Sequence, residues 1–164
     1  MSVKVTKVIS VGSFLWRTES DGTHVLKRAS TLCFEFSHNG IDGVAKVCFC
    51  GEATDGNGFR CDGLSVPKIF RWFLPSWDDK NSVYNLAGAF HDWLYSTKGN
   101  FGVFTREECD DFFRGLLRES GIGRIKAGCA DKAVEWFAGG DDHWGNDEYG
   151  IRPLARMEVS RCLL

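Results

Sequence analysis

The feature that most constrains the fold is a change in the period of the apolar residues near the middle of the chain. Over the first 50 residues apolar and polar side chains alternate, which is the pattern of half-buried strands. From Val83 onward apolar residues recur at the i, i+3, i+4, i+7 spacing of one helix face. Because the two patterns occupy separate halves of a 164-residue sequence, they predict an α+β fold in a single domain.

Most of the predicted strands form two hairpins. Asp21-Gly22 suits the tight type I′ turn of a β-hairpin. Asn39-Gly40 and Asp42-Gly43 lie in the loop of a second hairpin, whose register the sequence defines less well. Together these hairpins predict an antiparallel sheet over about residues 3–50. The expected strands are residues 3–9, 14–17, 25–28, 31–36 and 44–49.

The remainder is predicted as a long loop followed by three helices. Residues 51–82 are rich in glycine and aspartate, so we expect an irregular segment, and a loop of this length is usually functional. One helix starts at Val83, a second starts at the capping box Thr105-x-x-Glu108, and a third covers 125–137. The parts of the single domain 1–164 are then a β-rich part (1–50), an irregular part (51–82), a helical part (83–140) and a tail without a clear pattern (141–164).

Charge and hydropathy argue against two kinds of partner. Lys plus Arg number 20 against 22 Asp plus Glu, so the chain lacks the basic excess that binds a phosphate backbone, and we expect no nucleic-acid partner. No apolar run approaches the roughly 18–20 residues of a membrane-spanning helix. Residues 1–7 alternate instead of forming the apolar stretch of a signal peptide, so we expect a protein made in a cytoplasm.

Seven cysteines match no export or redox pattern. Their number is odd, no CxxC pair occurs, and several lie on predicted apolar faces, where cysteine acts as a small hydrophobic residue. Buried free thiols are therefore the expected state. A metal cluster around Cys48, Cys50 and Cys61, and disulfide bonds, are the alternatives that the sequence leaves open.

The side chains best suited to chemistry lie on the first predicted helix, in the run His91-Asp92-Trp93-Leu94-Tyr95. At about 100° per residue, His91 lies at the shoulder of the apolar stripe centred on Phe90, and Tyr95 follows on the same side. Asp92 is expected to point away from the core. The helix would thus present a half-buried imidazole beside an outward carboxylate.

Asp110 has a comparable position on the second helix, beside its apolar stripe, whereas Asp111 is expected to face solvent. In an antiparallel helix pair, Asp110 can accept the second ring N–H of His91. Such a carboxylate fixes the tautomer and stabilises the imidazolium that forms when the other nitrogen accepts a proton. This is the orienting half of a hydrolytic site with water as the nucleophile. The structural alternative is a buried polar pair that only satisfies its hydrogen bonds.

Acidic residues near this pair suggest a cation site. Asp92 and Asp62 offer the oxygen ligands that calcium prefers. Zinc, with His143 as a further ligand, is a weaker candidate because no regular ligand spacing connects the residues. His24 and His38 are expected to have ordinary surface roles.

The aromatic cluster of the irregular segment has two interpretations. Phe70, Trp72, Phe73 and Trp77 belong either to the core or to an exposed collar that contacts a lipid or a protein. No Gly-x-Ser-x-Gly motif surrounds the nearby Ser65, so a serine nucleophile is not expected. As candidate substrate contacts we name Ser65, Phe70 and Trp72.

The helix pair resembles the catalytic helices of phospholipase A2. The shared residues are His91-Asp92-x-x-Tyr95 and the later Asp110, within about residues 83–118. In that superfamily the histidine activates water, the adjacent aspartate binds calcium, and the later aspartate orients the imidazole. The resemblance implies that His91, Asp110 and Tyr95 are catalytic and that Asp92 is a calcium ligand.

A second resemblance covers more of the chain, about residues 59–138, and concerns the phage and prophage family called domain of unknown function 1353. The matching segments, in order, are Cys61-Asp62-Gly63-Leu64-Ser65-Val66-Pro67, Ala89-Phe90-His91-Asp92-Trp93-Leu94-Tyr95 and Arg106-x-x-Cys109-Asp110-x-x-Phe113. The sequence departs from the pattern of this family at Cys61, Leu64 and Cys109, but none of these departures removes a candidate polar group. The resemblance implies a phage origin and a common site for Asp62, Ser65, His91, Asp92 and Asp110, but it implies no activity.

Two main functions follow, with a third alternative. The first is a structural or accessory protein of the virion, which docks to other virion proteins through the edges of its hairpins. The second is a hydrolase, dependent on calcium or another metal, that acts on a lipid or another ester through water activated by His91. A cytoplasmic protein that binds a host partner shares the features of the first.

Overall fold

The computed structural model describes residues 2–52, 57–63, 75–123, 129 and 144–161. Its main element is a four-stranded antiparallel sheet with the order β1-β4-β5-β7. A smaller three-stranded sheet has the order β2-β3-β6. The strands are β1 (Val3–Val11), β2 (Trp16–Thr18), β3 (His24–Leu26), β4 (Ser30–His38), β5 (Ile41–Phe49), β6 (Arg60–Cys61) and β7 (Ala155–Arg161).

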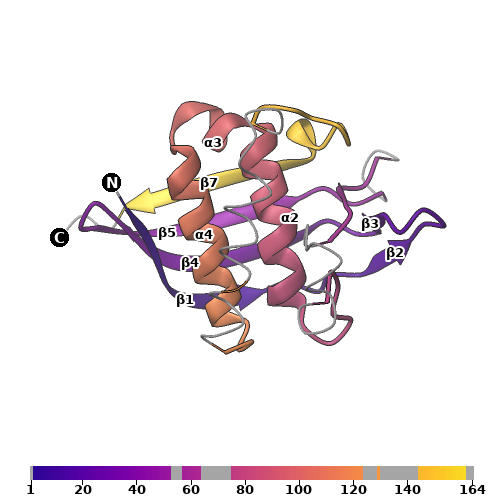
Figure 1. Ribbon diagram of the computed structural model, residues 1–164, viewed down its shortest axis with the longest axis horizontal. Coiled ribbons are helices and arrows are strands. Elements are labelled where there is room, and N and C mark those ends of the chain that lie inside the picture. The colour runs from indigo at the N-terminus through magenta and orange to yellow at the C-terminus, as the bar shows by residue number, and fades with distance from the viewer. Residues whose placement is uncertain (1, 53–56, 64–74, 124–128, 130–143, 162–164) are drawn as a thin grey trace.

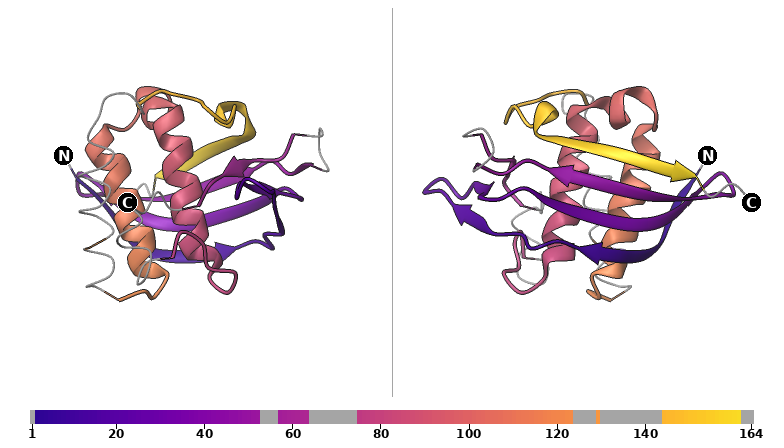
Figure 2. Two further views of the ribbon diagram at one scale, coloured as in Figure 1. Left: turned by 45° about the vertical axis from the view of Figure 1, so that its right-hand side comes forward. Right: turned by 180° about the vertical axis from the view of Figure 1, so that it is seen from behind.

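The helices lie side by side on one face of the larger sheet, as Figure 1 shows. They are α2 (Ser82–Ser96), the short α3 (Lys98–Gly102) and α4 (Arg106–Glu119). Viewed from behind, the sheet presents a second face that no described helix covers (Figure 2). A 3-10 turn, η3 (Arg152–Leu154), leads into β7.

The core between helices and sheet is largely aromatic. Phe34 on β4, Phe90 on α2 and Phe112 on α4 meet with ring centroids 5.8 Å apart in each pair, at steep interplanar angles. All three are fully buried. Such edge-to-face contacts add to the stability that apolar burial provides, and they fix the distance between the helices and the sheet.

The structure confirms an α+β fold with antiparallel hairpins. The expected type I′ turn at Asp21-Gly22 is wrong, because Thr18 pairs with His24 across a longer loop of residues 19–23 and Asp21 has no positive φ. The second hairpin turns at Asn39-Gly40, whose φ angles of 54° and 81° are those of a two-residue type I′ turn. β7 comes from the tail, in which the sequence showed no clear pattern. The predicted helix over 125–137 lies outside the described residues apart from residue 129.

The six described cysteines are free thiols, and Cys61 and Cys109 are buried. No helix in the described ranges is long and apolar enough to cross a membrane.

Candidate functional site

The first helix places His91 and Tyr95 on one side. Asn81 caps α2, because its side-chain oxygen accepts the backbone N–H of Tyr84 at 3.0 Å. From Tyr84 to Ser96 every residue except Asp92 is buried. The burial holds α2 in a fixed rotation against the sheet, and with it the direction of the imidazole.

α4 begins at the predicted capping box. The Oγ1 of Thr105 accepts the backbone N–H of Glu108 at 3.3 Å, and Glu108 in turn accepts the backbone N–H of Thr105 at 2.9 Å. Phe112 and Leu116 bury the same face of α4 against the core. This start sets the rotation that turns Asp110 toward α2.

His91, Tyr95 and Asp110 meet between the two helices. The Nε2 of His91 lies 2.9 Å from the Oδ1 of Asp110, and the hydroxyl of Tyr95 donates to the same oxygen at 2.8 Å. The Nε of Arg106 donates to the Tyr95 hydroxyl at 3.2 Å, and its guanidinium lies 5.6 Å from the centre of the Tyr95 ring. We call these four residues the His91 cluster.

The His91 cluster is nearly closed to solvent. The side chain of His91 is 11% exposed and that of Asp110 is 21% exposed. The imidazole packs between the rings of Tyr95 and Phe113, with centroids 4.3 and 4.8 Å away. Trp144 contacts the Tyr95 ring edge-on at 5.2 Å. These contacts leave the imidazole little freedom to rotate away from Asp110.

Protonation of the cluster follows from this geometry. Burial and the charge of Asp110 raise the pKa of Tyr95, against the opposing effect of Arg106. The phenol therefore stays protonated, and its O–H donates a hydrogen bond to Asp110. With Nε2 bound to Asp110, Nδ1 of His91 has no hydrogen-bond partner among the described residues. The arrangement suits an imidazole that accepts a proton at Nδ1 while Asp110 stabilises the resulting cation.

The expectation that Asp92 points into solvent is wrong. Its Oδ2 is shielded from solvent and has no hydrogen-bond partner in the described part of the chain. Burial, and then the charge of Asp62, raise the pKa of Asp92 well above its usual range. The helical wheel predicted that this side of α2 faces solvent. In the structure β6, which contains the fully buried Cys61, packs against it.

Asp92 and Asp62 form a two-carboxylate group whose charges also act on Cys61 and Tyr149. Burial first, and then the Asp92 charge, raise the pKa of the Cys61 thiol. The pKa of Tyr149 rises to about 12, through burial and the charge of Asp62 above all. Asp62 itself is exposed, whereas the Oδ2 of Asp92 is shielded from solvent. The negative charge of the two carboxylates favours a proton or a cation beside Asp92.

The fit of this region to a metal ion is partial. The unpartnered Oδ2 of Asp92 and the neighbouring Asp62 are the oxygen donors that calcium takes. No group of three or more His, Cys, Asp or Glu side chains in the described ranges is arranged to hold a metal. Further ligands would therefore be backbone carbonyls and water, which is a calcium-like set and an unusual set for zinc.

Several predicted residues lie elsewhere. Ser65, Phe70 and Trp72, named as substrate contacts, fall outside the described residues, as do Phe73 and His143. Trp77 is described and packs, partly buried, against the core: it stacks on His24 at 3.6 Å and meets Trp16 edge-on at 5.3 Å.

Three polar residues that were expected at the surface have structural partners. His24 is 8% exposed under Trp77 and bonds the Thr18 hydroxyl. His38 binds the buried Glu108. Asp111 accepts the backbone N–H of Val3 at 3.0 Å and so fastens α4 to β1. These partners come from elements distant in the sequence or from loops, and local sequence patterns do not show which of them pack together.

The structure also adds residues that the sequence did not single out for chemistry. Arg106 lies one turn before Asp110 on α4, and this i, i+4 spacing was the available signal. Trp144 and Tyr149 come from the tail, where no pattern pointed to the site.

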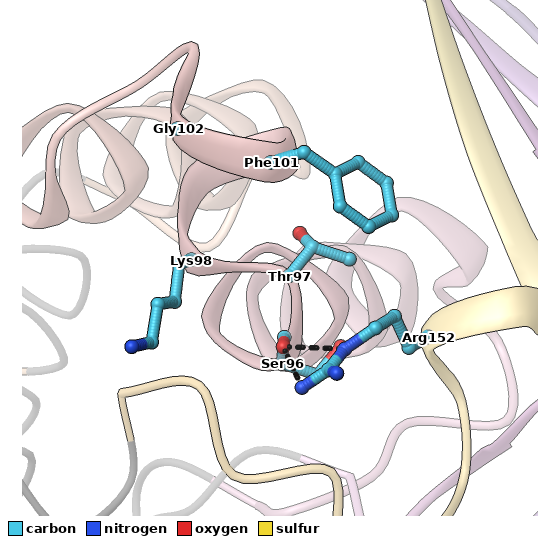
Figure 3. A pocket seen from close by; sticks show the side chains of 6 residues that line it. All are labelled: Ser96, Thr97, Lys98, Phe101, Gly102 and Arg152. Carbon is cyan, nitrogen blue, oxygen red and sulfur yellow. Dashed lines mark hydrogen bonds between the residues drawn. The ribbon is translucent and has the colours of Figure 1, made fainter.

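A separate hollow of about 430 Å³ lies at the C-terminal end of α2 (Figure 3). Arg152 donates to the carbonyl of Ser96 from Nε at 3.0 Å and from Nη2 at 2.8 Å, and to that of Gly145 at 3.0 Å. These bonds satisfy a carbonyl of the last turn of α2 with a cation, as the helix dipole favours. The hollow is lined by Ser96, Thr97, Lys98, Phe101, Gly102 and Arg152, and we assign it a structural role.

The fold and the His91 cluster define an α+β protein with a histidine–carboxylate pair between two helices. The chain belongs to the family described as Protein of unknown function (DUF1353), whose model matches residues 51–134. The match includes Asp62, His91, Asp92, Tyr95 and Asp110. No curated protein and no solved structure matches the chain, so the likeness to phospholipase A2 stays a hypothesis.

Proposed function

We propose that the chain is a hydrolase that acts on an ester, with His91 as the general base for a water molecule. One observation carries the proposal: His91 is bound to Asp110 through Nε2, while Nδ1 has no partner among the described residues. A buried imidazole oriented by a carboxylate, with its other nitrogen available, is the arrangement that general-base catalysis requires.

In this mechanism Nδ1 of His91 takes a proton from water as the oxygen attacks the ester carbonyl carbon. Asp110 stabilises the imidazolium, and Tyr95 and Arg106 hold Asp110 in place. The imidazolium then returns its proton to the leaving oxygen as the C–O bond breaks, so that an acid and an alcohol are released. A calcium ion bound by Asp92 and Asp62 would polarise the carbonyl.

The substrate class within this proposal is a lipid ester. It rests on the resemblance of the two helices to phospholipase A2. The phage origin and the location in a virion are likewise part of the proposal and rest on the resemblance of the three sequence segments to phage and prophage proteins. An envelope lipid of the host is the ester that such a protein would meet.

The test is fatty-acid release from mixed phospholipid vesicles, with calcium or with a chelator. His91→Gln should reduce release by at least about 100-fold. The chain offers a matched control, His38→Gln, because His38 also binds a carboxylate, at 2.8 Å from Glu108. His38→Gln should reduce release far less than His91→Gln, because His38 lies outside the His91 cluster. Equal release from wild type and His91→Gln would contradict the proposal.

A second candidate is a non-catalytic virion protein in which the His91 cluster is a polar staple between helices. It is favoured by the fact that one oxygen of Asp110 already receives two donors, from His91 and Tyr95. This candidate predicts no release by the wild type under any condition. It also predicts that His91→Gln lowers the free energy of unfolding, because Asp110 loses a buried partner.

A further inference from the structure

β7 is an edge strand of the main sheet, and no described strand pairs with its outer side. It pairs with β5 on one side only, over Ala155 to Arg161. In the described part of the chain, no hydrogen bond joins the outward backbone groups of β7 to another segment. Figure 2 shows β7 along one border of the sheet, with β1 along the other. A free edge of this length is a template for another strand.

The opposite edge is protected in ways that β7 is not. β1 pairs with β4 through a register interrupted at two places, between Val5 and Lys7 and between Val8 and Ser10. Its backbone is also occupied by α4, because Asp111 accepts the N–H of Val3 and Glu119 accepts the N–H of Val8 at 3.3 Å. Bulges and covered N–H groups block strand addition, so among the described residues β7 is the edge that stays open to a further strand.

The side chains of β7 divide cleanly between the two faces. Met157 lies opposite the buried Val47 and Val159 lies opposite the buried Ala45, so both face the helix side. Val159 is nevertheless 39% exposed, because it lies at the border of the core. On the other face, the side chains of Arg156 and Glu158 are 74% and 53% exposed and lie 3.1 Å apart. Over residues 155–159, one face of the edge is therefore apolar and the other carries one charge of each sign.

We propose that two copies of the chain pair antiparallel through β7, about a twofold axis at Met157. In this register Arg156 lies opposite the partner's Glu158, and Glu158 lies opposite the partner's Arg156. On the helix side, Val159 meets the partner's Ala155, and Met157 meets the partner's Met157. The two four-stranded sheets become one continuous sheet.

The charges select this register from its neighbours. Two residues that lie directly opposite each other point to the same face of the sheet. Because successive side chains point to opposite faces, the numbers of the two residues must differ by an even number, and the twofold axis then passes at a residue. An axis at Glu158 would place the two Glu158 carboxylates opposite each other, and an axis at Arg156 would do the same with two guanidinium groups. Like charges directly opposite are destabilising. Of these three registers, only the one with its axis at Met157 places two pairs of unlike charges opposite each other and also covers Val159.

The proposal is tested by sedimentation equilibrium over a range of concentrations, with charge-reversal variants. The wild-type chain should approach twice its 18.4 kDa monomer mass as concentration rises. Arg156→Glu alone and Glu158→Arg alone each place like charges opposite each other, and each should weaken dimerisation by about tenfold or more. An equimolar mixture of the two single variants should restore it, because each variant then faces opposite charges. The double variant Arg156→Glu/Glu158→Arg should also dimerise.

Two results would overturn the proposal. A wild-type chain that stays monomeric at every concentration would show that the edge takes no second copy, leaving a strand from another protein as the remaining occupant. A dimer whose strength is the same in all variants would place the interface away from β7. Thermal melting at a concentration where every variant is monomeric provides the folding control, because both side chains are mainly exposed and their reversal should then not change the melting temperature.

Discussion

His38, at the end of β4, binds Glu108, on the first turn of α4, with its Nε2 2.8 Å from Oε1 of the carboxylate. The side chain of Glu108 is only 2% exposed. The same carboxylate closes the capping box with Thr105. One buried group therefore fastens the second hairpin to the start of α4, on which Asp110 follows two residues after Glu108.

The first prediction concerns the pH dependence of this contact. Burial would raise the pKa of Glu108, but the hydrogen bonds from Thr105 and His38 outweigh it and hold the pKa below the ordinary 4.5. A carboxyl group with a lowered pKa stabilises the fold fully above its unfolded-state pKa, and this contribution is lost as the pH falls through the folded-state value. Glu108→Gln should therefore lower the free energy of unfolding at pH 7 by about 1–3 kcal/mol.

The measurement is urea denaturation of wild type and Glu108→Gln at pH 7 and at pH 3. The difference between the two proteins should shrink as the pH falls to 3, because the unfolded wild type then binds a proton at Glu108 and the contribution of the charged carboxylate is lost as the pH approaches its lowered folded-state pKa. A difference of the same size at both pH values would mean that the charge of Glu108 contributes nothing.

The second prediction concerns the Tyr95 hydroxyl, which donates to Asp110 and accepts from Arg106. Tyr95→Phe removes one donor from the carboxylate that orients His91. If the chain is a hydrolase, kcat should fall about tenfold, since a hydrogen bond to a charged group contributes about 1.5 kcal/mol.

The check is a double-mutant cycle on ester hydrolysis. In an Asp110→Asn background, Tyr95→Phe should have little further effect on kcat, because the two groups act through one contact. Full additivity of the two losses would show that Tyr95 acts independently of Asp110.

The sequence predicted local features well and contacts between distant elements poorly. The Asn39-Gly40 turn and the capping box at Thr105 depend on neighbouring residues, and both are present. The surroundings of Asp92 and Asp111 depend on which strands pack against the helices, and both were expected in solvent. A helical wheel shows the direction of a side chain but not what covers it.

The same distinction applies to the candidate site. His91 and Asp110 could be paired in advance because α2 and α4 lie close together in the sequence, with only the short α3 between them. Trp144 and Tyr149 could not be found, because they come from a tail that meets the helices only in the folded chain.

The third prediction concerns the close approach of α4 to β1. A Cβ added at Gly115 would lie 2.6 Å from Cβ and 2.8 Å from Cγ2 of Val5, which is too near for either side to remain in place. Alanine favours a helix interior over glycine by about 1 kcal/mol, but overpacking of a core costs about 1–3 kcal/mol. Gly115→Ala should therefore lower the free energy of unfolding on balance. An increase, measured by chemical denaturation, would mean that helix propensity prevails and that α4 and β1 are not in such close contact.

The fourth prediction separates the cation hypothesis from simple burial of Asp92. In a chelator, Asp92→Asn should raise the melting temperature, because a neutral amide replaces a shielded carboxylate that has no partner in the described residues and lies near the charge of Asp62. Calcium should raise the melting temperature of the wild type by mass action and leave that of Asp92→Asn unchanged. Asp111→Asn is the matched control, because Asp111 is a half-buried carboxylate on α4 that binds Val3 and takes no part in the Asp92 group. Its calcium response should equal that of the wild type. If calcium stabilises none of the three proteins, then the Asp92 carboxylate holds a proton where the hypothesis places a cation, and any hydrolysis by His91 must proceed without one.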